Sequence, residues 1–407
     1  MTATLNLHEV RSCYGGPRAV AMPAESGKQM TSSEWPPSRP VMGYNTWYQF
    51  RTGITESEVV RQAELLVSSG LAAAGYECVN LDDGWMAGER AANGELTGDA
   101  AKFPHGMAWL ADRIHELGLR FGLYTAIGSR TCQALPASWE HYDQDAQTFA
   151  SWGVDFVKVD DCGGLPKGMT VEALTEHFRQ FGARLRQHNP DVVYSQELPI
   201  HQICKPTFRS SVQASAEFAH MWRVAHDENP LSHDYAYAMI LGHLAAVVDL
   251  HPFAGPGHWN DLDMIAPGFP ASGWTLADLR NQLSVWAMEA SPLLIGADIA
   301  ALPPDALAAL KNPHMIAIDQ SGEQCSTVIM NGHVEALVKP DPEGGVAALF
   351  VNLGTGTATG RFPLSQLGIT SARASGYDVW TGETTTFSEV PVTLESRQTL
   401  LLRIKGI

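Results

Sequence analysis

The sequence predicts an α/β fold in which a (β/α)8 TIM barrel is followed by a C-terminal antiparallel β-sandwich. Three observations lead to this prediction. Short β-rich runs recur roughly every 25–45 residues, with amphipathic helical patterns between them. Carboxylate and aromatic side chains gather where these runs end. After about Asp319 the helical patterns stop, and short alternating runs separated by turn residues replace them.

The barrel is expected over residues 36–320. Its strands are expected in apolar runs at 41–47, 76–83, 119–126, 154–161, 192–197, 216–223, 257–264 and 292–299. Continuous apolar strands that alternate with helices are typical of a parallel sheet buried on both faces. Eight such units fit a closed barrel. The pattern alone leaves an open doubly wound sheet as an alternative.

The segments that link these runs have the spacing of amphipathic helices. Between the first two strands, Val59, Ala63, Leu66 and Val67 fall on one helical face. Leu110, Ile114 and Leu117 share a face before the third strand. Side chains three or four residues apart lie on the same side of a helix, so these stripes are expected to cover the sheet.

The segments on either side of the barrel have a different character. Residues 321–407 alternate apolar runs with Gly, Asp-Pro and Asn-Gly turns, which predicts a small β-sandwich domain. Residues 1–35 contain a polar stretch rich in Ser, Gly and Lys. They are expected to form an N-terminal extension that is ordered only where it packs on the body.

Composition and charge exclude several classes of function. The chain has 407 residues and a formal net charge of −17. A nucleic-acid partner is therefore not expected, because phosphate contacts require clustered Lys and Arg. No apolar run approaches the roughly 18 residues that a membrane span needs. Neither a GxGxxG nor a GK[ST] phosphate loop occurs in a suitable context, so no cofactor is expected.

The N-terminal sequence has neither a basic region nor an apolar region of the kind found in secretory signals. A cytoplasmic location is expected if the chain is full length, and a secreted one if a signal was removed before this numbering begins. The sequence leaves open whether the chain forms a homo-oligomer.

The cysteines and histidines give no metal pattern. The six cysteines are too few for a disulfide scaffold and contain no CxxC pair, so neither a catalytic nor a structural metal site is expected. The histidines form no HxH or HExxH motif. Cys78 lies inside an expected strand and is predicted to be part of the core. The cysteines are Cys13, Cys78, Cys132, Cys162, Cys204 and Cys325.

Charged side chains follow the expected strands at their C-terminal ends, where barrel active sites lie. They are Asp82, Asp83, Asp160, Asp161, Glu197, Arg223, Asp227, Asp261, Asp263 and Asp298. A single Asp in such a place is often only a helix N-cap. The interleaved aromatic residues Trp47, Trp85, Tyr124, Trp222 and Trp259 favour a binding site. Paired carboxylates with aromatic platforms suit glycoside hydrolysis, in which one carboxylate attacks the anomeric carbon and the other transfers a proton.

Five motifs occur in a fixed order along the chain. They are MGYNTW, GYECVNLDDGW, KFPHGMAWLADRIHELGLRFGLY, TFASWGVDFVKVDDC and AGPGHWNDLDM. In these motifs the sequence resembles the α-galactosidases and α-N-acetylgalactosaminidases of glycoside hydrolase family 27, the melibiase-like enzymes. The resemblance extends from about Pro40 to the C-terminus. It implies a barrel with a C-terminal β-domain and a hydrolase that acts on terminal sugars.

The resemblance implies roles for two catalytic aspartates and two cations. In VKVDDC, Asp160 matches the nucleophile, and Lys158, two residues earlier on the same strand face, matches a sugar ligand. The cation at Lys158 is expected to keep Asp160 ionised. In WRVAHD, Asp227 matches the acid/base and Arg223 a sugar ligand. Asp227 is expected to have a raised pKa, because it must be protonated to act as an acid.

Further positions match the sugar pocket of the family. Asp82 and Asp83 match the acidic pair that holds the 4- and 6-hydroxyls. Trp47, Tyr124 and Met264 match pocket-wall positions, although plain barrel packing is the alternative for the last two. Cys132 and Cys162 match a disulfide of the family. In a cytosolic protein two reduced thiols would be the better expectation.

The fifth strand departs from the family pattern. Glu197 is retained, whereas Gln196 and Leu198 replace a cysteine and a tryptophan, and Ile200 and His201 follow. Glu197 together with the bulky Ile200 favours a sugar with a free 2-hydroxyl, because an N-acetyl group would clash. The third-strand tract also has Ala in place of an acidic residue found in many relatives.

The resemblance therefore implies a retaining exo-α-galactosidase that acts on small α-galactosides by double displacement. Its two catalytic carboxylates are expected about 5–5.5 Å apart. One alternative is a relative with altered sugar choice, a β-L-arabinopyranosidase or an α-N-acetylgalactosaminidase. A second is a non-catalytic sugar-binding protein, because fold alone does not establish catalysis.

Overall fold

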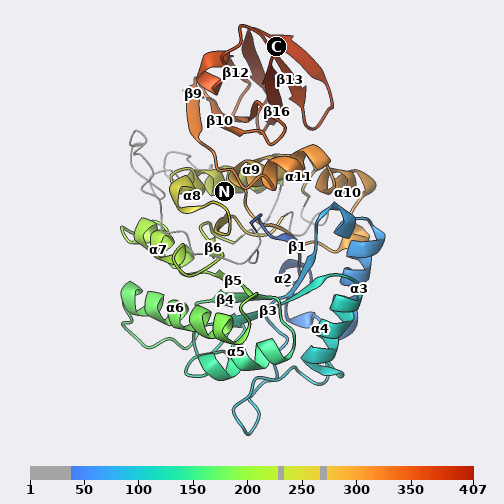
Figure 1. Ribbon diagram of the computed structural model, residues 1–407, viewed down its shortest axis with the longest axis vertical. Coiled ribbons are helices and arrows are strands. Elements are labelled where there is room, and N and C mark those ends of the chain that lie inside the picture. Colours follow the sequence, from blue (N-terminus) through green and yellow to red (C-terminus); the bar gives the residue numbers. More distant parts are fainter. Residues whose placement is uncertain (1–37, 228–232, 266–272) are drawn as a thin grey trace.

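The computed structural model describes residues 38–227, 233–265 and 273–407. The expected N-terminal extension at 1–35, with Cys13, lies outside the described residues. The described chain is elongated, with a barrel in its lower part and a β-domain at its upper end (Figure 1). Helices α8, α9 and α11 lie between the two (Figure 1).

Eight parallel strands form the barrel, and each lies inside one of the predicted apolar runs. They are β1 (Met42–Asn45), β2 (Cys78–Leu81), β3 (Arg120–Ala126), β4 (Phe156–Asp160), β5 (Val193–Gln196), β6 (Met221–Arg223), β7 (Trp259–Asp261) and β8 (Leu293–Ile295). The strand order is β7-β6-β5-β4-β3-β2-β1-β8. A parallel bridge between Ile265 and Ile295 joins the two ends of this order. The ring is thereby closed, which confirms the predicted barrel over an open doubly wound sheet.

Helices surround the barrel and connect its strands. They are α2 (Trp47–Phe50), α3 (Glu56–Ser68), α4 (Gly106–Glu116), α5 (Tyr142–Ser151), α6 (Val171–His188), α7 (Phe208–Ser215), α8 (His233–Val247), α9 (Leu276–Glu289), α10 (Pro304–Leu310) and α11 (Pro313–Asp319). Most residues of the predicted stripes face inward, since Val59, Ala63 and Leu66 on α3 are fully buried, as are Leu110 and Ile114 on α4. The prediction is wrong for Val67, which is 42% exposed near the end of α3, and Leu117, directly after α4, is only partly buried. The buried side chains cover the outer face of the sheet.

Helix α9 is the most deeply buried of these helices. A capping box at Thr275 and Asp278 satisfies backbone N–H groups at its first turn. All but one of the residues from Asp278 to Glu289 are buried. The helix lies between the barrel and the β-domain (Figure 1), so it has almost no face left for solvent.

The C-terminal domain is the predicted antiparallel β-sandwich. Its strands are β9 (Thr327–Asn331), β10 (Val334–Pro340), β11 (Val346–Asn352), β12 (Ala358–Pro363), β13 (Ala374–Asp378), β14 (Thr384–Phe387), β15 (Glu389–Leu394) and β16 (Thr399–Gly406). Six of them form a sheet in the order β14-β13-β16-β11-β10-β9, and β12 pairs with β15 in a second sheet.

The six-stranded sheet is buried on both faces, which strand β11 shows residue by residue. Ala347, Leu349 and Val351 belong to the same hydrophobic core as the barrel helices. Ala348 and Phe350 point to the opposite face and belong to the core between the two sheets. Because side chains alternate along a strand, one strand serves both cores. The barrel and the sandwich are therefore joined by a continuous apolar interface.

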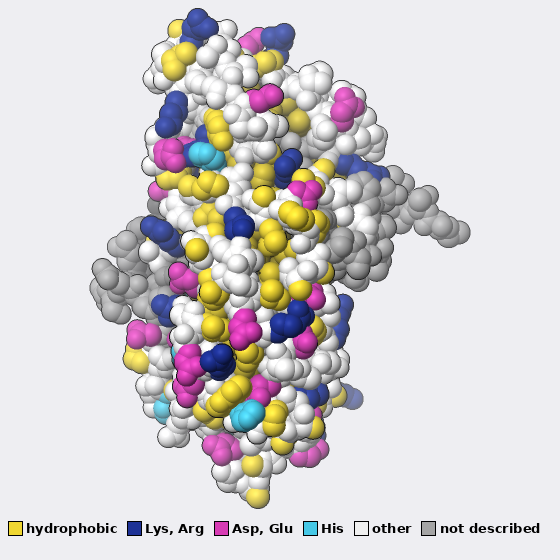
Figure 2. Space-filling model, turned by 90° about the vertical axis from the view of Figure 1, so that its right-hand side faces the viewer, with side chains coloured by type: hydrophobic (Ala, Val, Ile, Leu, Met, Phe, Trp, Pro, Cys, Tyr) yellow, Lys and Arg dark blue, Asp and Glu magenta, His cyan; other side chains and the backbone are white. Residues whose placement is uncertain are grey.

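The surface of the described chain is mixed in charge. On the face shown in Figure 2, Lys and Arg side chains are interspersed with Asp and Glu side chains. This face has no broad basic area of the kind that binds a phosphate backbone. Among the described residues, no helix has the length and apolar character needed to cross a membrane.

Candidate active site

Lys158 on β4 lies at the centre of three carboxylates at the C-terminal end of the barrel. Its Nζ is 3.2 Å from Asp82 Oδ2, 3.6 Å from Asp160 Oδ1 and 3.7 Å from Glu197 Oε1. Asp82 directly follows β2, Asp160 ends β4 and Glu197 directly follows β5. Parallel strands of a closed barrel end at one rim, which is why side chains so distant in sequence meet here.

Arg223, the last residue of β6, binds a second group of carboxylates. Its guanidinium donates to Glu197 Oε1 and to Asp227 Oδ1, each at 3.0 Å. It also lies 3.3 Å from Asp263 Oδ2. Glu197 is thus shared by Lys158 and Arg223. The expected catalytic residues Asp160 and Asp227 therefore belong to one chain of ion pairs.

The electrostatic environment of Asp160 differs from the expectation. Burial raises the pKa of Asp160 well above its usual range, and the charge of nearby Glu197 raises it further. Lys158 acts in the opposite direction but does not outweigh these two effects. Burial likewise raises the pKa of Glu197. The expectation that Lys158 keeps Asp160 ionised is wrong for this structure, because burial and the charge of Glu197 outweigh the effect of the lysine.

The environment of Asp227 also reverses an expectation. Burial acts to raise the pKa of Asp227, but the charges of Arg223 and Lys158 and a hydrogen bond from Arg223 lower it below its usual value. Burial is the largest single effect, but the two cations and the hydrogen bond together outweigh it. The Asp227 side chain is 66% exposed. The predicted raised pKa is therefore wrong. A sequence cannot show that an arginine four residues earlier donates directly to this carboxylate.

The acidic pair that follows β2 is buried. Asp82 Oδ2 accepts a hydrogen bond from Asn45 Nδ2 at 2.8 Å. Asp83 accepts from the backbone N–H groups of Gly84 at 2.7 Å and Gln133 at 3.1 Å. Burial, with the adjacent charge of Asp82, raises the pKa of Asp83 to about 6.

Cys132 and Cys162 form a disulfide, with their Cα atoms 4.9 Å apart. This is the pairing implied by the family resemblance, and two reduced thiols are excluded in this structure. Cys132 Sγ lies 3.8 Å from Asp160 Oδ2 and accepts a hydrogen bond from the Tyr124 hydroxyl at 3.5 Å. The disulfide and Tyr124 therefore flank the expected nucleophile. Cys78 is buried in β2, as predicted.

Trp47 and Met264 lie together at the same end of the barrel. Met264 is buried and belongs to a small apolar cluster against which Trp47 and Tyr48 pack. The Arg51 guanidinium lies 5.1 Å from the Trp47 ring centroid. The two expected wall residues, one following β1 and the other following β7, are thus brought into one cluster.

Two residues of the site had no role assigned from the sequence. Asp263 connects Arg223 to the Tyr48 hydroxyl, which donates to Asp263 Oδ2 at 2.6 Å. Its backbone φ of +81° lies in the left-handed region that favours glycine. Asn45 holds Asp82, as described above. Both residues lie in motifs of the resemblance, and that is the only sequence signal that could have pointed to them.

The residues that depart from the family pattern have contrasting environments. Gln196 and Leu198 are fully buried, and Gln196 Oε1 accepts a hydrogen bond from the Leu198 backbone at 2.6 Å. Ile200 is also buried. The His201 side chain is half-exposed, with Nε2 2.5 Å from Asp161 Oδ1, and this hydrogen bond raises the pKa of His201.

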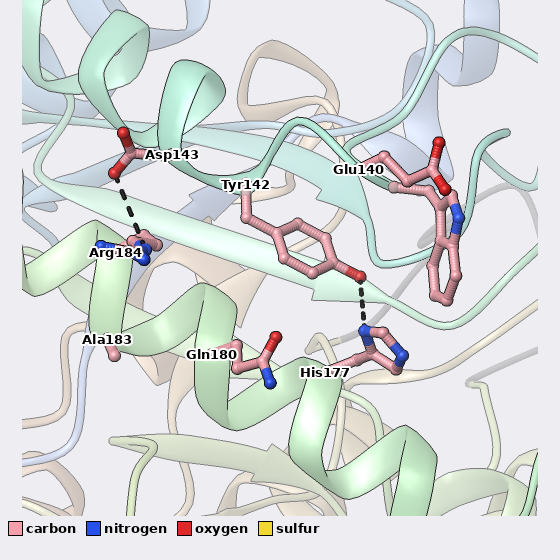
Figure 3. A pocket seen from close by; sticks show the side chains of 8 residues that line it. Glu140, Tyr142, Asp143, His177, Gln180, Ala183 and Arg184 are labelled. Carbon is pink, nitrogen blue, oxygen red and sulfur yellow. Dashed lines mark hydrogen bonds and ion pairs between the residues drawn. The ribbon is translucent and has the colours of Figure 1, made fainter.

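Two hollows in the described chain differ in position and size. A cavity of about 10 Å³, the size of one water molecule, lies among Asn45, Lys158, Arg223 and Asp263 of the site. A larger depression of about 490 Å³ lies between α5 and α6 and shares no lining residue with the site (Figure 3). Figure 3 shows two contacts across it, one between Tyr142 and His177 and the other between Asp143 and Arg184.

The chain forms a (β/α)8 barrel whose rim carries acidic side chains around a lysine and an arginine. Together with its relatives, this arrangement defines the chain as a glycoside hydrolase. Residues 39–321 match the family model described as alpha galactosidase A. Residues 331–404 match the alpha galactosidase C-terminal beta sandwich domain. The chain belongs to this melibiase-like family, glycoside hydrolase family 27.

Individual relatives cover most of the chain. It is 33% identical to alpha-galactosidase A of Cellvibrio japonicus over 86% of this chain and 88% of the relative. It is 32% identical to an alpha-galactosidase of Cyamopsis tetragonoloba, over 84% of this chain and 79% of the relative.

Solved structures share the fold. Alpha-galactosidase I from Mortierella vinacea aligns with a TM-score of 0.83 at 24% identity, over 92% of this chain and 99% of that one. A family 27 β-L-arabinopyranosidase from Geobacillus stearothermophilus aligns with a TM-score of 0.78 at 21% identity, over 91% and 98%.

Proposed function

We propose that this glycoside hydrolase removes terminal α-D-galactosyl residues from oligosaccharides or glycosides, with net retention of configuration at the anomeric carbon. Two kinds of observation support the proposal. Relatives named as alpha-galactosidases match most of the chain at 32–33% identity. The observation that carries the mechanism is the chain of ion pairs that connects Asp160 to Asp227 through Lys158, Glu197 and Arg223.

The reaction proceeds in two displacements. In the first, the Asp160 carboxylate attacks the anomeric carbon while protonated Asp227 donates its proton to the departing glycosidic oxygen. The bond to the aglycone breaks and a β-galactosyl ester forms on Asp160. In the second, Asp227 removes a proton from water, and the water oxygen displaces Asp160 from the anomeric carbon. The product is α-galactose, and both carboxylates return to their starting state.

The buried oxygen of Asp160 suits it to this role. Asp160 Oδ1 is buried and has no hydrogen bond within 3.5 Å from the described residues, and the Lys158 ammonium lies 3.6 Å from it. Burial strengthens its interaction with Lys158, because charges interact more strongly where water is excluded.

The sugar hydroxyls bind the charged side chains around the nucleophile. Asp82 and Asp83 accept from the 4- and 6-hydroxyls, and an axial 4-hydroxyl held by this pair distinguishes galactose from glucose. Lys158, Glu197 and Arg223 bind the remaining hydroxyls. Rigid, ion-paired partners hold a sugar in one orientation with little reorganisation, which is the basis of their contribution to the rate.

Substrate binding adjusts the protonation of the two carboxylates. The aglycone covers the exposed Asp227 and a sugar hydroxyl takes an N–H group of Arg223, and both changes raise the pKa of Asp227. Hydroxyl groups that donate to Asp160 and Glu197 stabilise their ionised forms and so lower their raised pKa values. The bound state thereby reaches the ionised nucleophile and protonated acid that the first displacement requires.

The second candidate function is hydrolysis of a different terminal sugar. It is considered because the residues in and after the fifth strand differ from the family pattern. Gln196 and Leu198 are buried beside Glu197, and Ile200 follows them. Glu197 with a bulky Ile200 supports a 2-hydroxyl over an N-acetyl group. A panel of nitrophenyl α-D-galactoside, β-L-arabinopyranoside and α-N-acetylgalactosaminide decides the preference. Hydrolysis of none of these would support the sugar-binding alternative.

The test of the reaction is hydrolysis of nitrophenyl α-D-galactoside with the first product anomer followed by NMR. We expect α-galactose to appear first, and β-galactose as the first product would contradict retention. Asp160→Asn should lower kcat by a factor on the order of 10³ or more. Asp298→Asn is the matched control, because Asp298 follows β8 but binds Gln62 and Arg61 on α3. Near-normal turnover of Asp160→Asn would refute the assignment.

A further inference from the structure

Three potential metal ligands of different chemistry meet at the junction of the barrel and the sandwich. They are His251 in a 3-10 turn after α8, Glu289 at the end of α9, and Cys325 just before β9. One ligand atom from each lies within 4.8 Å of the other two. The cluster lies outside the candidate active site and shares no residue with it.

One oxygen of this cluster lacks a partner. The Glu289 side chain is completely buried, and its Oε2 lies 2.7 Å from His251 Nε2. The other oxygen, Oε1, is buried and has no hydrogen bond of good geometry from the described residues, because the adjacent Cys325 thiol donates to Met288 O at 3.2 Å. A buried carboxylate oxygen without a donor costs free energy, so a partner for Oε1 would stabilise the fold.

The donor set is that of zinc. An imidazole nitrogen, a carboxylate oxygen and a thiolate sulfur are the three ligand types that bind Zn²⁺ in proteins. Zinc–ligand distances are about 2.0–2.3 Å, so each donor would have to move by about 1 Å or less from its present position. The His251 side chain is 12% exposed, which leaves a path for the ion and for a water molecule as fourth ligand.

A buried lysine lies beside the cluster. Lys339 is a buried charged group that interacts with Cys325 and Glu289, and Asp319 interacts in turn with Lys339. The Lys339 ammonium donates to Ala287 O at 2.7 Å and to Glu323 O at 3.0 Å.

We propose that His251, Glu289 and Cys325 bind a structural zinc ion that joins the barrel to the sandwich. The sequence contains no CxxC signal for it because the three ligands come from three separate segments. His251 and Glu289 already contact one another at 2.7 Å. A buried His–Glu ion pair without metal is therefore the competing explanation that the experiment must exclude.

The first measurement is the metal content of the full chain purified without chelators. We expect about one zinc per chain by mass spectrometry. Removal of the metal should lower the Tm, and addition of Zn²⁺ should restore it, because an ion that binds only the folded state stabilises it. A metal-free protein whose Tm does not respond to Zn²⁺ would overturn the proposal.

The second measurement identifies the ligands. Co²⁺ added to the metal-free protein should produce a sulfur-to-cobalt charge-transfer band. Cys325→Ser should lose this band, and His251→Gln should lower the Co²⁺ affinity at least tenfold while keeping the band. His251→Gln also remains informative if Cys325→Ser does not fold, because His251 is partly exposed.

The controls are the other two free cysteines of the described chain. Cys78→Ser changes a thiol that is buried in β2, and Cys204→Ser changes an exposed one. Both should keep the charge-transfer band and the response of the Tm to Zn²⁺. Loss of the band in Cys204→Ser, with the band retained in Cys325→Ser, would place the metal at the exposed thiol and refute the proposed site.

Discussion

Arg223 interacts with three carboxylates of the site. The charge of each carboxylate changes the effect of Arg223 on the other two. It donates to Glu197 and Asp227 and lies 3.3 Å from Asp263. Its charge lowers the pKa of Asp227. The negative charge of Asp263 partly offsets that of Arg223, so Asp263 positions the arginine and limits its effect on the acid/base.

Asp263→Asn is predicted to move the alkaline limb of kcat, which reports the substrate complex, to lower pH. Without the charge of Asp263, Arg223 lowers the pKa of Asp227 further, and Asp227 loses its catalytic proton earlier as pH rises. The shift should be up to about one pH unit. Tyr48→Phe is the control, because it removes the hydrogen bond to Asp263 but keeps the charge. A limb that stays in place or moves to higher pH would show that Asp263 does not act through Arg223.

Asp83 makes a testable contribution to stability. Its folded-state pKa of about 6 lies above the unfolded value of about 3.9. Its stabilising effect is therefore complete below the unfolded value and is lost as pH rises through about 6. From pH 4 to pH 7, the free energy of unfolding of the wild type should fall relative to Asp83→Asn. The expected fall is about 2 to 3 kcal/mol, at 1.36 kcal/mol per pKa unit.

Urea unfolding of both proteins at several pH values measures this difference. Asp298→Asn should show the opposite pH dependence of the free energy of unfolding. Hydrogen bonds from Gln62 and Arg61 lower the pKa of Asp298, although burial acts to raise it. Its contribution to stability should be lost as pH falls. An Asp83→Asn difference that does not change with pH would contradict the raised pKa.

At the scale of elements, the loops after β3 and β4 are in direct backbone contact. A Cβ atom on Gly128 would lie 1.9 Å from Gly163 O and 2.7 Å from Cys162 O. Only glycine allows this approach. The contact brings the loop that carries Cys132 against the loop that carries Cys162, next to the nucleophile.

Gly128→Ala is therefore predicted to destabilise the protein by about 1–3 kcal/mol, the usual cost of forcing extra volume into a packed region. It should also lower kcat, because separating the loops moves the disulfide away from Asp160. Gly88→Ala is the matched control, since a Cβ atom there meets no atom within 4 Å. Denaturant unfolding and turnover measured on both variants test the prediction, and equal behaviour of the two would contradict it.

At the scale of the whole molecule, the barrel and sandwich share one apolar interface. Leu349 on β11 faces the barrel helices and Phe350 faces the interior of the sandwich. Polar contacts add to this interface, such as the bond from Trp380 Nε1 to Ser284 Oγ on α9 at 2.8 Å. Two domains joined in this way are expected to unfold together.

We predict a single transition in differential scanning calorimetry. Leu349→Ala and Phe350→Ala should each lower its Tm, with a cost of about 2–5 kcal/mol for the loss of a large buried side chain. The two substitutions act on opposite faces of one strand, so they separate the two cores. Two transitions, with each variant shifting a different one, would show that barrel and sandwich unfold independently.

Much of the site could be predicted because strand ends meet at one rim. The C-terminal ends of β2, β4, β5 and β6 bring the expected acids and cations together, and the resemblance identified which of them to examine. The contribution of Asp263 could not be predicted. Its contact with Tyr48 spans 215 residues of sequence, and its left-handed backbone leaves no local signature in residue type.

The sequence by itself determined the order of elements, the helix faces and the alternation of the sandwich strands. These features depend on side-chain periodicity along one segment, which can be seen in a linear chain. Only the tertiary structure decided the direction of the pKa shifts, the disulfide and the cluster at His251, Glu289 and Cys325. Desolvation and Coulomb interactions depend on distances between segments that are far apart in the chain, and folding alone sets those distances.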